Sequence, residues 1–177
     1  MKLTEIFKEC KAQWINAIDE KNHPFKTFVL STIERNEPKS RSVILRGFDS
    51  KKMNFTIYSD LRSNKIKELN NSSSVQLLFY NSISRFQTIV RAQMINMNSD
   101  LKIFNTLTEH SKKNYTSSIS PGKLIQDPYD LTFGKEINFC QLVFKAISVE
   151  CLQLKKNQNI RSYFEFNKSW KGFYIAP

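Results

Sequence analysis

The chain has 177 residues, of which 40% are hydrophobic and 24% charged, values typical of one soluble globular domain. The 14 Phe residues argue against disorder, and only 4 Gly and 5 Pro residues exclude collagen-like and linker-rich designs. A formal net charge of +11 favours anionic partners such as nucleotides, phosphorylated ligands, polyanions or acidic membrane surfaces.

The sequence offers neither a membrane segment nor a metal-binding pattern. No apolar stretch approaches the roughly 20 residues that span a bilayer. The N-terminal segment is interrupted by charges and lacks a signal-peptide core, so we expect a cytoplasmic protein. Three cysteines (Cys10, Cys140 and Cys151) and two histidines provide neither a disulfide framework nor the ligands of a closed zinc site. We therefore expect three buried or half-buried free thiols and no metal.

The first half of the chain begins with an expected helix and continues with strands. Apolar residues recur at three- and four-residue steps over residues 3–19, which predicts an amphipathic helix. Asn22-His23-Pro24 ends this pattern, because a residue before proline is disfavoured in helical geometry. Segments rich in β-branched and aromatic residues, separated by polar turns, then predict antiparallel strands. These strands cover residues 25–34, 40–48, 53–60, 75–80 and 85–95, with a short helix over 62–71.

The second half predicts one more helix and a return to strands. Ser99 can cap a helix that continues towards residue 115, and residues 116–136 form a loop without clear periodicity. Further strands are expected over residues 137–144, 148–155, 160–166 and 170–177. Eight or nine short strands without an internal repeat predict one domain over residues 1–177. It is mainly β with flanking helices and forms an antiparallel barrel. Because such a barrel is filled by its own side chains, a planar cofactor must bind its outer wall under a second surface.

The arginines indicate where a ligand site lies. Five of the seven, Arg41, Arg46, Arg62, Arg85 and Arg91, fall between residues 41 and 91, and the guanidinium fork suits phosphate or carboxylate. Regular strand geometry would turn Arg41 and Arg46 to opposite sides of the sheet.

The start of the 62–71 helix is a second candidate feature. Arg62 and Lys65 lie there with the hydroxyls of Ser59 and Ser63, and a helix N-terminus favours phosphate. Gln87, on a later strand, carries a donor and an acceptor for the edge of a heterocycle. A basic surface turn with a capped helix is the structural alternative for these residues.

Common catalytic and nucleotide-binding motifs are absent. The sequence contains no Gly-x-Gly-x-x-Gly, no Walker-type loop and no Gly-x-Ser-x-Gly elbow. Neither His23 nor His110 has an evident orienting partner, so hydrolysis by a triad or a metal has little support and no catalytic residue is identified.

Three segments together resemble the pyridoxamine 5′-phosphate oxidase family of FMN-binding split barrels. They are RSVILRGFDSKKMNF, YSDLRSNKIKEL and RFQTIVRAQ. The family's Arg-x-Val-x-Leu-(Lys/Arg)-Gly-Phe strand corresponds to Arg41–Phe48, and its Arg-x-Gln corresponds to Arg85-Phe86-Gln87. Its Tyr-Thr-Asn and Ser-Arg-Lys correspond to Tyr58-Ser59-Asp60 and Ser63-Asn64-Lys65. PGKLI, INFCQLVF, VECLQL and the Trp170 to Ala-Pro ending are similar to a less characterised, oxidase-related branch, so the resemblance covers residues 25–177.

This resemblance implies a homodimer with an FMN site in each groove between the subunits. It implies that the ribityl chain and phosphate are lined by Arg41, Ser42, Val43 and Ile44. Tyr58 and Ser59 would contact the phosphate or the ring edge. The phosphate would be held by Arg62, Ser63 and Lys65. Gln87 and Arg161 would contact the flavin, and Arg46 would lie near the substrate.

The chain departs from the family at several positions. Asn64 replaces an arginine beside the phosphate-binding lysine, and Leu152 takes the place of a flavin-contacting tryptophan. KKNQNIRSYF has no counterpart of the Arg-x-His pair that holds pyridoxamine, and residues 104–120 lack the Tyr/Arg/Ser group for the substrate phosphate. The resemblance therefore supports FMN binding better than oxidation of pyridoxamine phosphate.

Three functional hypotheses follow from the sequence. The first is an FMN-dependent oxidoreductase with a small-molecule substrate of unknown identity. The alternative is a flavin- or haem-binding module on the same fold without turnover. The third is nucleic-acid binding driven by the charge of +11, although the chain lacks the aromatic and basic interleaving of known readers.

Overall fold

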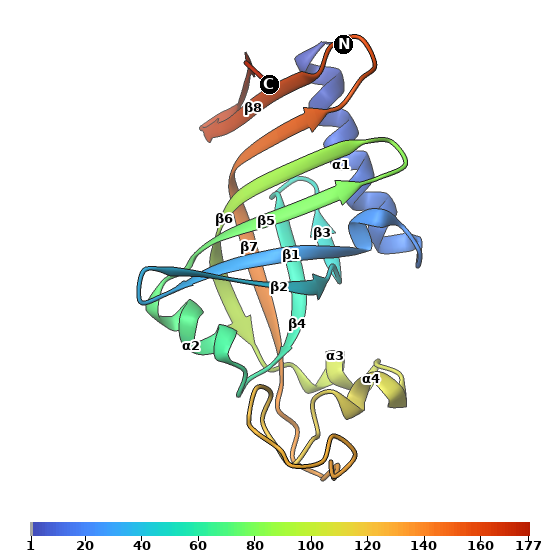
Figure 1. Cartoon of the computed structure of the whole chain (residues 1–177), viewed down its shortest axis with the longest axis vertical. Helices are drawn as coiled ribbons and strands as arrows, with labels where there is room; N and C mark the ends of the chain where they lie inside the picture. The colour runs from blue at the N-terminus through green and yellow to red at the C-terminus, as the bar shows by residue number, and fades with distance from the viewer. Residues whose placement is uncertain (1) are drawn as a thin grey trace.

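A single antiparallel sheet forms most of the molecule (Figure 1). The computed structural model describes residues 2–177, and over these residues nine strands pair in the order β2-β1-β5-β6-β7-β4-β3, with β8 and β9 continuing from β7. The strands are β1 (Thr27–Glu34), β2 (Glu37–Ile44), β3 (Gly47–Asp49), β4 (Asn54–Asp60), β5 (Ser74–Asn81), β6 (Phe86–Asn98), β7 (Phe139–Gln153), β8 (Ile160–Asn167) and β9 (Ser169–Ile175). The predicted architecture, mainly antiparallel β with few helices, is confirmed.

The longest helix runs along one side of the sheet, and the shorter helices lie towards the end opposite to β8 and β9 (Figure 1). The helices are α1 (Leu3–Asp19), α2 (Asn64–Asn71), α3 (Leu101–Asn105) and α4 (Glu109–Lys113), with a 3-10 turn η1 (Pro24–Lys26) after α1. Figure 1 shows α1 beside β8 at one end, and α3, α4 and the following loop at the other. No helix within residues 2–177 has both the length and the apolar character needed to cross a membrane.

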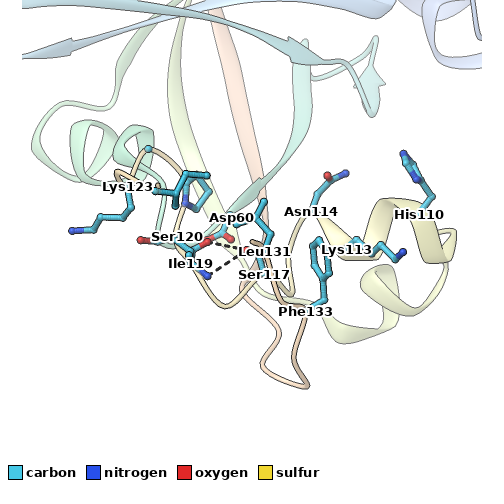
Figure 2. A pocket seen from close by; sticks show the side chains of 13 residues that line it. Asp60, His110, Lys113, Asn114, Ser117, Ile119, Ser120, Lys123, Leu131 and Phe133 are labelled. Carbon is cyan, nitrogen blue, oxygen red and sulfur yellow. Dashed lines mark hydrogen bonds between the residues drawn. The ribbon is translucent and has the colours of Figure 1, made fainter. Parts of the chain in front are cut away.

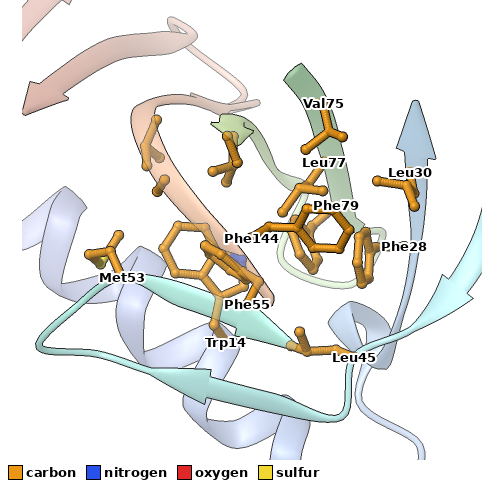
Figure 3. Close-up of a cluster of buried hydrophobic side chains, with 14 of the residues drawn as sticks. Trp14, Phe28, Leu30, Leu45, Met53, Phe55, Val75, Leu77, Phe79 and Phe144 are labelled. Atoms are coloured by element: carbon orange, nitrogen blue, oxygen red, sulfur yellow. The ribbon is translucent and has the colours of Figure 1, made fainter. Parts of the chain in front are cut away.

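The core lies between α1 and the inner face of the sheet. Ile6, Cys10, Trp14 and Ala17 recur at three- and four-residue steps and are buried, so the predicted helix over residues 3–19 is confirmed with its apolar stripe inward. The Trp14 ring lies 5.0 Å from Phe55 and 5.9 Å from Phe79 (Figure 3). These aromatic side chains fill the interior, so a cofactor has no space among them.

The long strand β7 organises the sheet, because different strands share one of its edges. β6 pairs along nearly all of it, whereas β4 pairs with its first half and β8 with its second half. The sequence prediction of two strands, 137–144 and 148–155, is therefore wrong. The intervening Lys145, Ala146 and Ile147 include neither Gly nor Pro, and β7 continues through them beside β6.

Two other predicted elements are divided. The expected strand 40–48 breaks after Ile44, because Leu45 N–H bonds to Lys26 on one side and Arg46 N–H to Thr56 on the other. The expected helix from Ser99 to about residue 115 becomes α3 and α4. Asp100 caps the first, and Thr108 caps the second by accepting from Ser111 N–H, so a new helix starts there.

Candidate functional site

A cavity of about 290 Å³ opens between β2, β4, α2 and the segment that follows α4. Eight of the predicted site residues line it: Arg41, Ser42, Val43, Ile44, Arg46, Tyr58, Ser59 and Lys65. Ser63 lines an adjoining cavity of about 650 Å³ that shares Arg41, Lys65 and Pro121 with the first. The fold thus brings together residues from two strands and one helix that the sequence grouped only by motif.

Lys65 is the cation at the centre of this site. Its Nζ donates hydrogen bonds to the hydroxyls of Ser59 and Ser63, each over 3.1 Å, and both serines are buried. No carboxylate of residues 2–177 lies within ion-pair distance of Lys65. Burial, followed by repulsion from Arg41, lowers its pKa below the ordinary lysine value. A half-buried ammonium group with two hydroxyls and no counter-ion is suited to an anionic ligand.

The buried carboxylate of Glu68 holds the Arg41 side chain in place. Glu68, on α2, is 3% exposed and accepts a hydrogen bond from Arg41 Nη2 over 2.5 Å. Thr32 bonds to both groups, since its hydroxyl donates to Glu68 and accepts from Arg41 Nη1. This network fixes the guanidinium at the cavity wall and compensates its charge, so Lys65 and Arg46 carry the uncompensated charge.

Arg46 faces the same cavity as Arg41. The expectation that the two arginines face opposite sides is therefore wrong. The strand breaks at the buried Leu45, so the period-two rule does not reach Arg46. The Arg46 guanidinium lies 5.5 Å from the centre of the Tyr58 ring, within the range of a cation–π contact.

Sequence reasoning missed three residues that complete the cavity wall. Asn114, Tyr115 and Pro121 come from the end of α4 and the loop beyond it. Burial raises the pKa of Tyr115, so its hydroxyl is protonated at neutral pH and can donate a hydrogen bond. Pro121 begins the PGKLI segment, but the resemblance assigned no role to that segment, and no motif includes Asn114 or Tyr115. Only the fold, which places these residues in one cavity with Lys65, reveals them as lining residues.

Arg62 has other partners than the expected phosphate. Its side chain grips the buried Asp60 through two hydrogen bonds of 3.1 and 2.8 Å and donates a third to Ser117 O over 2.9 Å. Arg62 lines none of the cavities around this site. It therefore neutralises Asp60 and ties the loop that follows α4 to the end of β4.

Gln87 and Arg161 also lie away from the cavity within one chain. Strand register places Tyr80, Gln87, Leu152 and Arg161 side by side on the outer face of β5, β6, β7 and β8. Tyr80 is 47% exposed in this row, and the Arg161 guanidinium pairs with Glu150 over 2.8 Å. The row is a separate, partly apolar surface with hydrogen-bonding groups.

A further cavity of about 430 Å³ adjoins the site beneath the loop (Figure 2). It shares Asp60, Asn114 and Pro121 with the first cavity. Lys113 and Lys123 bring positive charge to its wall, and apolar surface comes from Ile119, Ile125, Leu131 and Phe133. Lys113 Nζ lies 5.8 Å from the centre of the Phe133 ring. The only acid among its described lining residues, Asp60, is already paired with Arg62.

No cysteine is among the described residues that line the cavity between β2, β4 and α2. Burial raises the pKa of the nearby Cys140 to about 11, so this thiol is protonated at neutral pH. Among residues 2–177, no group of three His, Cys, Asp or Glu side chains is placed to hold a metal ion.

Fold and site together define an antiparallel split barrel with a cavity on its wall that is lined by Arg41, Arg46 and Lys65. Comparison with protein families gives a specific assignment: residues 7–98 match "Pyridoxamine 5'-phosphate oxidase, FMN-binding domain". The chain belongs to this family. The matched segment contains every predicted site residue except Arg161.

Solved structures agree with the fold. A pyridoxamine 5′-phosphate oxidase-related, FMN-binding protein from Nostoc punctiforme superposes with a TM-score of 0.78 at 17% identity, covering 97% of both chains. PhzG from Burkholderia lata, in complex with tetrahydrophenazine-1-carboxylic acid, gives 0.76 at 14% identity over 96% of this chain and 91% of that chain. General Stress Protein 26 from Bacillus anthracis gives 0.54 at 19% identity over 82% and 99%. No curated protein matches the sequence.

Proposed function

We propose that the chain binds FMN in the cavity between β2, β4 and α2 and acts as an FMN-dependent oxidoreductase. The observation that carries this proposal is the Lys65 cluster, a cation with two buried hydroxyls and no carboxylate partner within residues 2–177. Lys65, Ser59 and Ser63 would hold the phosphate, and Arg41, which is paired with Glu68, lines the same cavity. The family to which the chain belongs is FMN-binding by description.

When bound, the flavin supplies hydride transfer, so no side chain has to act as the redox group. The chain contributes binding and orientation. The segment Arg41–Ile44 would line the cofactor, and Tyr58 and Tyr115 on the cavity wall would help to exclude water from it. Arg46 lies on the same wall and is available to a negatively charged group of the substrate.

The substrate is proposed to occupy the cavity in Figure 2. Its lysines attract an acidic group, whereas Phe133 and Leu131 offer apolar surface to a ring. PhzG, a structural relative, binds an acid with a fused-ring body, which supports this substrate class by analogy. The expected substrate is therefore a small organic anion with an apolar body.

A second copy of the chain is proposed to complete the site. Gln87 and Arg161 lie on the outer row and cannot reach the cavity of their own chain through the filled interior. The exposed Tyr80 in this row offers apolar surface to a partner. A homodimer in which each outer row faces the other subunit's cavity would bring Gln87 to the flavin ring and exclude water from it.

Titration of the purified protein with FMN tests the cofactor proposal. We expect a yellow protein or, after removal of flavin, quenching of FMN fluorescence with a micromolar or lower Kd. Replacing Lys65 with Ala should weaken FMN binding roughly 10–150-fold, because a charge-assisted hydrogen bond contributes about 1.5–3 kcal/mol. Lys67→Ala is the matched control, since Lys67 is exposed on the same helix.

Two outcomes contradict the proposal. A colourless protein that does not bind FMN at micromolar concentrations would refute the proposal that the chain binds FMN. Equal effects of the Lys65 and Lys67 substitutions would show that any binding is not through this cavity.

A flavin-binding module without turnover is the second candidate. It is favoured because Asp60, the only acid among the described residues that line the proposed cofactor cavity, is already paired with Arg62, and none of these lining residues is a cysteine. Two experiments distinguish the oxidoreductase from the binding module. The FMN-loaded protein is mixed anaerobically with a nicotinamide nucleotide, and aerobically with candidate amines and acids, while the flavin absorbance is followed. Bleaching of the flavin absorbance by a donor favours the oxidoreductase, and a flavin that none of them reduces favours the module.

A further inference from the structure

Two of the three cysteines meet in the core, and neither lines the proposed cofactor cavity. Cys10 on α1 and Cys151 on β7 are separated by 141 positions, yet their sulfur atoms lie 2.7 Å apart. Both side chains are essentially inaccessible, at 0% and 1% exposure. This separation is within 1 Å of the roughly 2.05 Å of a disulfide bond.

The surroundings single out this pair. Cys151 is flanked in the sheet by Thr88 on β6 and Ser162 on β8, and the hydroxyls of both have no hydrogen-bond partner within the described residues. Cys140 lies on the other half of β7, paired with Ser59, so it serves as an internal reference thiol. Burial and the neighbouring sulfur raise the pKa of Cys10, so in the folded protein this group is a thiol at neutral pH.

We propose that Cys10 and Cys151 form a redox modification site, at which a low-molecular-weight disulfide such as glutathione disulfide converts the two thiols into one intramolecular disulfide. While the chain folds and both cysteines are still accessible, one of them loses its proton, and its thiolate attacks the glutathione disulfide, forms a mixed disulfide and releases one glutathione. The second cysteine thiolate attacks the protein sulfur of that mixed disulfide and releases the other glutathione. The protein loses two protons and two electrons, and both are recovered in the two glutathione thiols.

The modification would fasten α1 to the sheet. A bond between Cys10 and Cys151 closes a loop that spans most of the chain, so it restricts the unfolded state strongly. For a chain of this length, the expected result is a rise in Tm of roughly 5–15 °C. The cofactor cavity uses none of these residues, so FMN affinity should be unchanged.

Refolding in glutathione redox buffers tests the proposal, because refolding exposes both thiols before the core closes. The products are alkylated with N-ethylmaleimide under denaturing conditions and measured by mass spectrometry. We expect one alkylated cysteine, Cys140, and one cross-linked peptide containing Cys10 and Cys151. Three alkylated cysteines in oxidising buffer, a cross-link to Cys140 or a link between two chains would overturn the proposal.

Two variants act as controls. Cys140→Ser should still form the cross-link and gain the same Tm, whereas Cys10→Ser should do neither. If Cys10→Ser does not fold, the unsubstituted protein provides the test. Its oxidised and reduced forms are compared in mass and in Tm, which shows whether the disulfide forms and whether it stabilises the fold. An oxidised protein with an unchanged or lower Tm would also count against the proposed staple.

Discussion

Lys65 is the residue on which the proposed anion site depends most. Its ammonium group is partly removed from water and lies near Arg41, and both effects lower its pKa. In the unfolded chain the pKa returns to the ordinary value, so the unfolded state binds more protons between the two values. The free energy of unfolding therefore rises with pH between the lowered pKa and the ordinary lysine pKa. Below the lowered pKa, Lys65 is charged in both states, and its partial burial destabilises the folded protein.

A bound phosphate reverses this effect and couples FMN binding to a proton. The anion stabilises charged Lys65, so at alkaline pH binding requires proton uptake and affinity falls as pH rises through the lowered pKa. We expect the ratio of FMN to riboflavin affinity to fall between pH 7 and pH 10, measured by fluorescence titration. Riboflavin shares the ring but lacks the phosphate. Lys65→Arg should flatten the curve, and a ratio that does not change with pH in the native sequence would contradict the coupling.

At the residue scale, the sequence could predict side chains that are close in the chain. Arg41 and Lys65 stand out by charge, and Ser59 and Ser63 by their spacing from the α2 start. The partner of Arg62 could not be predicted, because its choice between Asp60 and a ligand depends on side-chain direction at one turn. Tyr115 could not be predicted as a lining residue, since it reaches the cavity only through tertiary packing.

The loop after α4 is an element whose position depends on one side chain. Arg62 joins the buried Asp60 to Ser117 O at the start of this loop, while Asn138 O accepts from Leu61 N–H at its end. Both ends are therefore fixed beside β4. The middle of the loop, including Lys123, is exposed.

Replacing Arg62 with Ala should loosen this loop and destabilise the fold. The substitution leaves Asp60 buried without a cation, which costs about 3–5 kcal/mol for a buried pair and less here because Arg62 remains 23% exposed. Limited trypsin digestion should cut faster at Lys123, and urea unfolding should give a lower midpoint. Asp60→Asn combined with Arg62→Ala should restore part of the stability. If the single substitution leaves both measurements unchanged, the tie between β4 and the loop has no energetic role.

The β8–β9 hairpin depends on one glycine for its contact with α1. A Cβ added at Gly172 would lie 2.5 Å from a ring carbon of Phe164, and that ring stacks on Phe7 at 4.7 Å. Phe164 is buried, so its ring cannot move without disturbing α1. Close approach of a strand and an aromatic ring thus requires glycine at this position.

Gly172→Ala should therefore lower the free energy of unfolding by about 1–3 kcal/mol, the usual cost of overpacking. Gly134→Ala is the matched control, because its Cβ would meet only one backbone atom at 3.9 Å. Urea unfolding followed by tryptophan fluorescence measures both variants. Equal stability of the two variants would show that Phe164 adjusts its ring freely.

At the element scale, periodicity predicted α1 and most strands, because their burial alternates regularly. It failed where a hydrogen-bond partner decides the boundary. The apolar run continues through Leu45, but the strand ends before it. At this point the backbone stops pairing with β1 and begins to bond to β4. Likewise β7 remains one strand because β6 accompanies it throughout, which no local pattern reveals.

For the whole molecule, the sequence indicated a β-rich barrel, whereas the strand order came only from the structure. Alternating apolar residues tell which face of a strand is buried but not which strand lies beside it. The order places β1, β5 and β6 between β2 and β7, and Gln87 on β6 is not among the residues that line the cavity between β2, β4 and α2. One chain alone therefore presents two incomplete halves of the proposed site.

Association and cofactor binding should consequently fail together. Tyr80→Glu places a charge in the outer row beside Gln87, where the proposed partner would bury it at a cost of several kcal/mol. We expect light scattering after gel filtration to give a dimer for the native sequence and a monomer for this variant. FMN affinity should fall at least tenfold, although Tyr80 lines no part of the phosphate cavity.

Ile15→Glu provides the control, because Ile15 is 42% exposed on α1, outside the outer row. This variant should remain dimeric and bind FMN normally, and circular dichroism melting verifies that both variants are folded. A native protein that binds FMN as a monomer at tens of micromolar would refute the shared site. So would a Tyr80→Glu monomer with unchanged FMN affinity, because the cavity of a single chain would then be sufficient to hold the flavin.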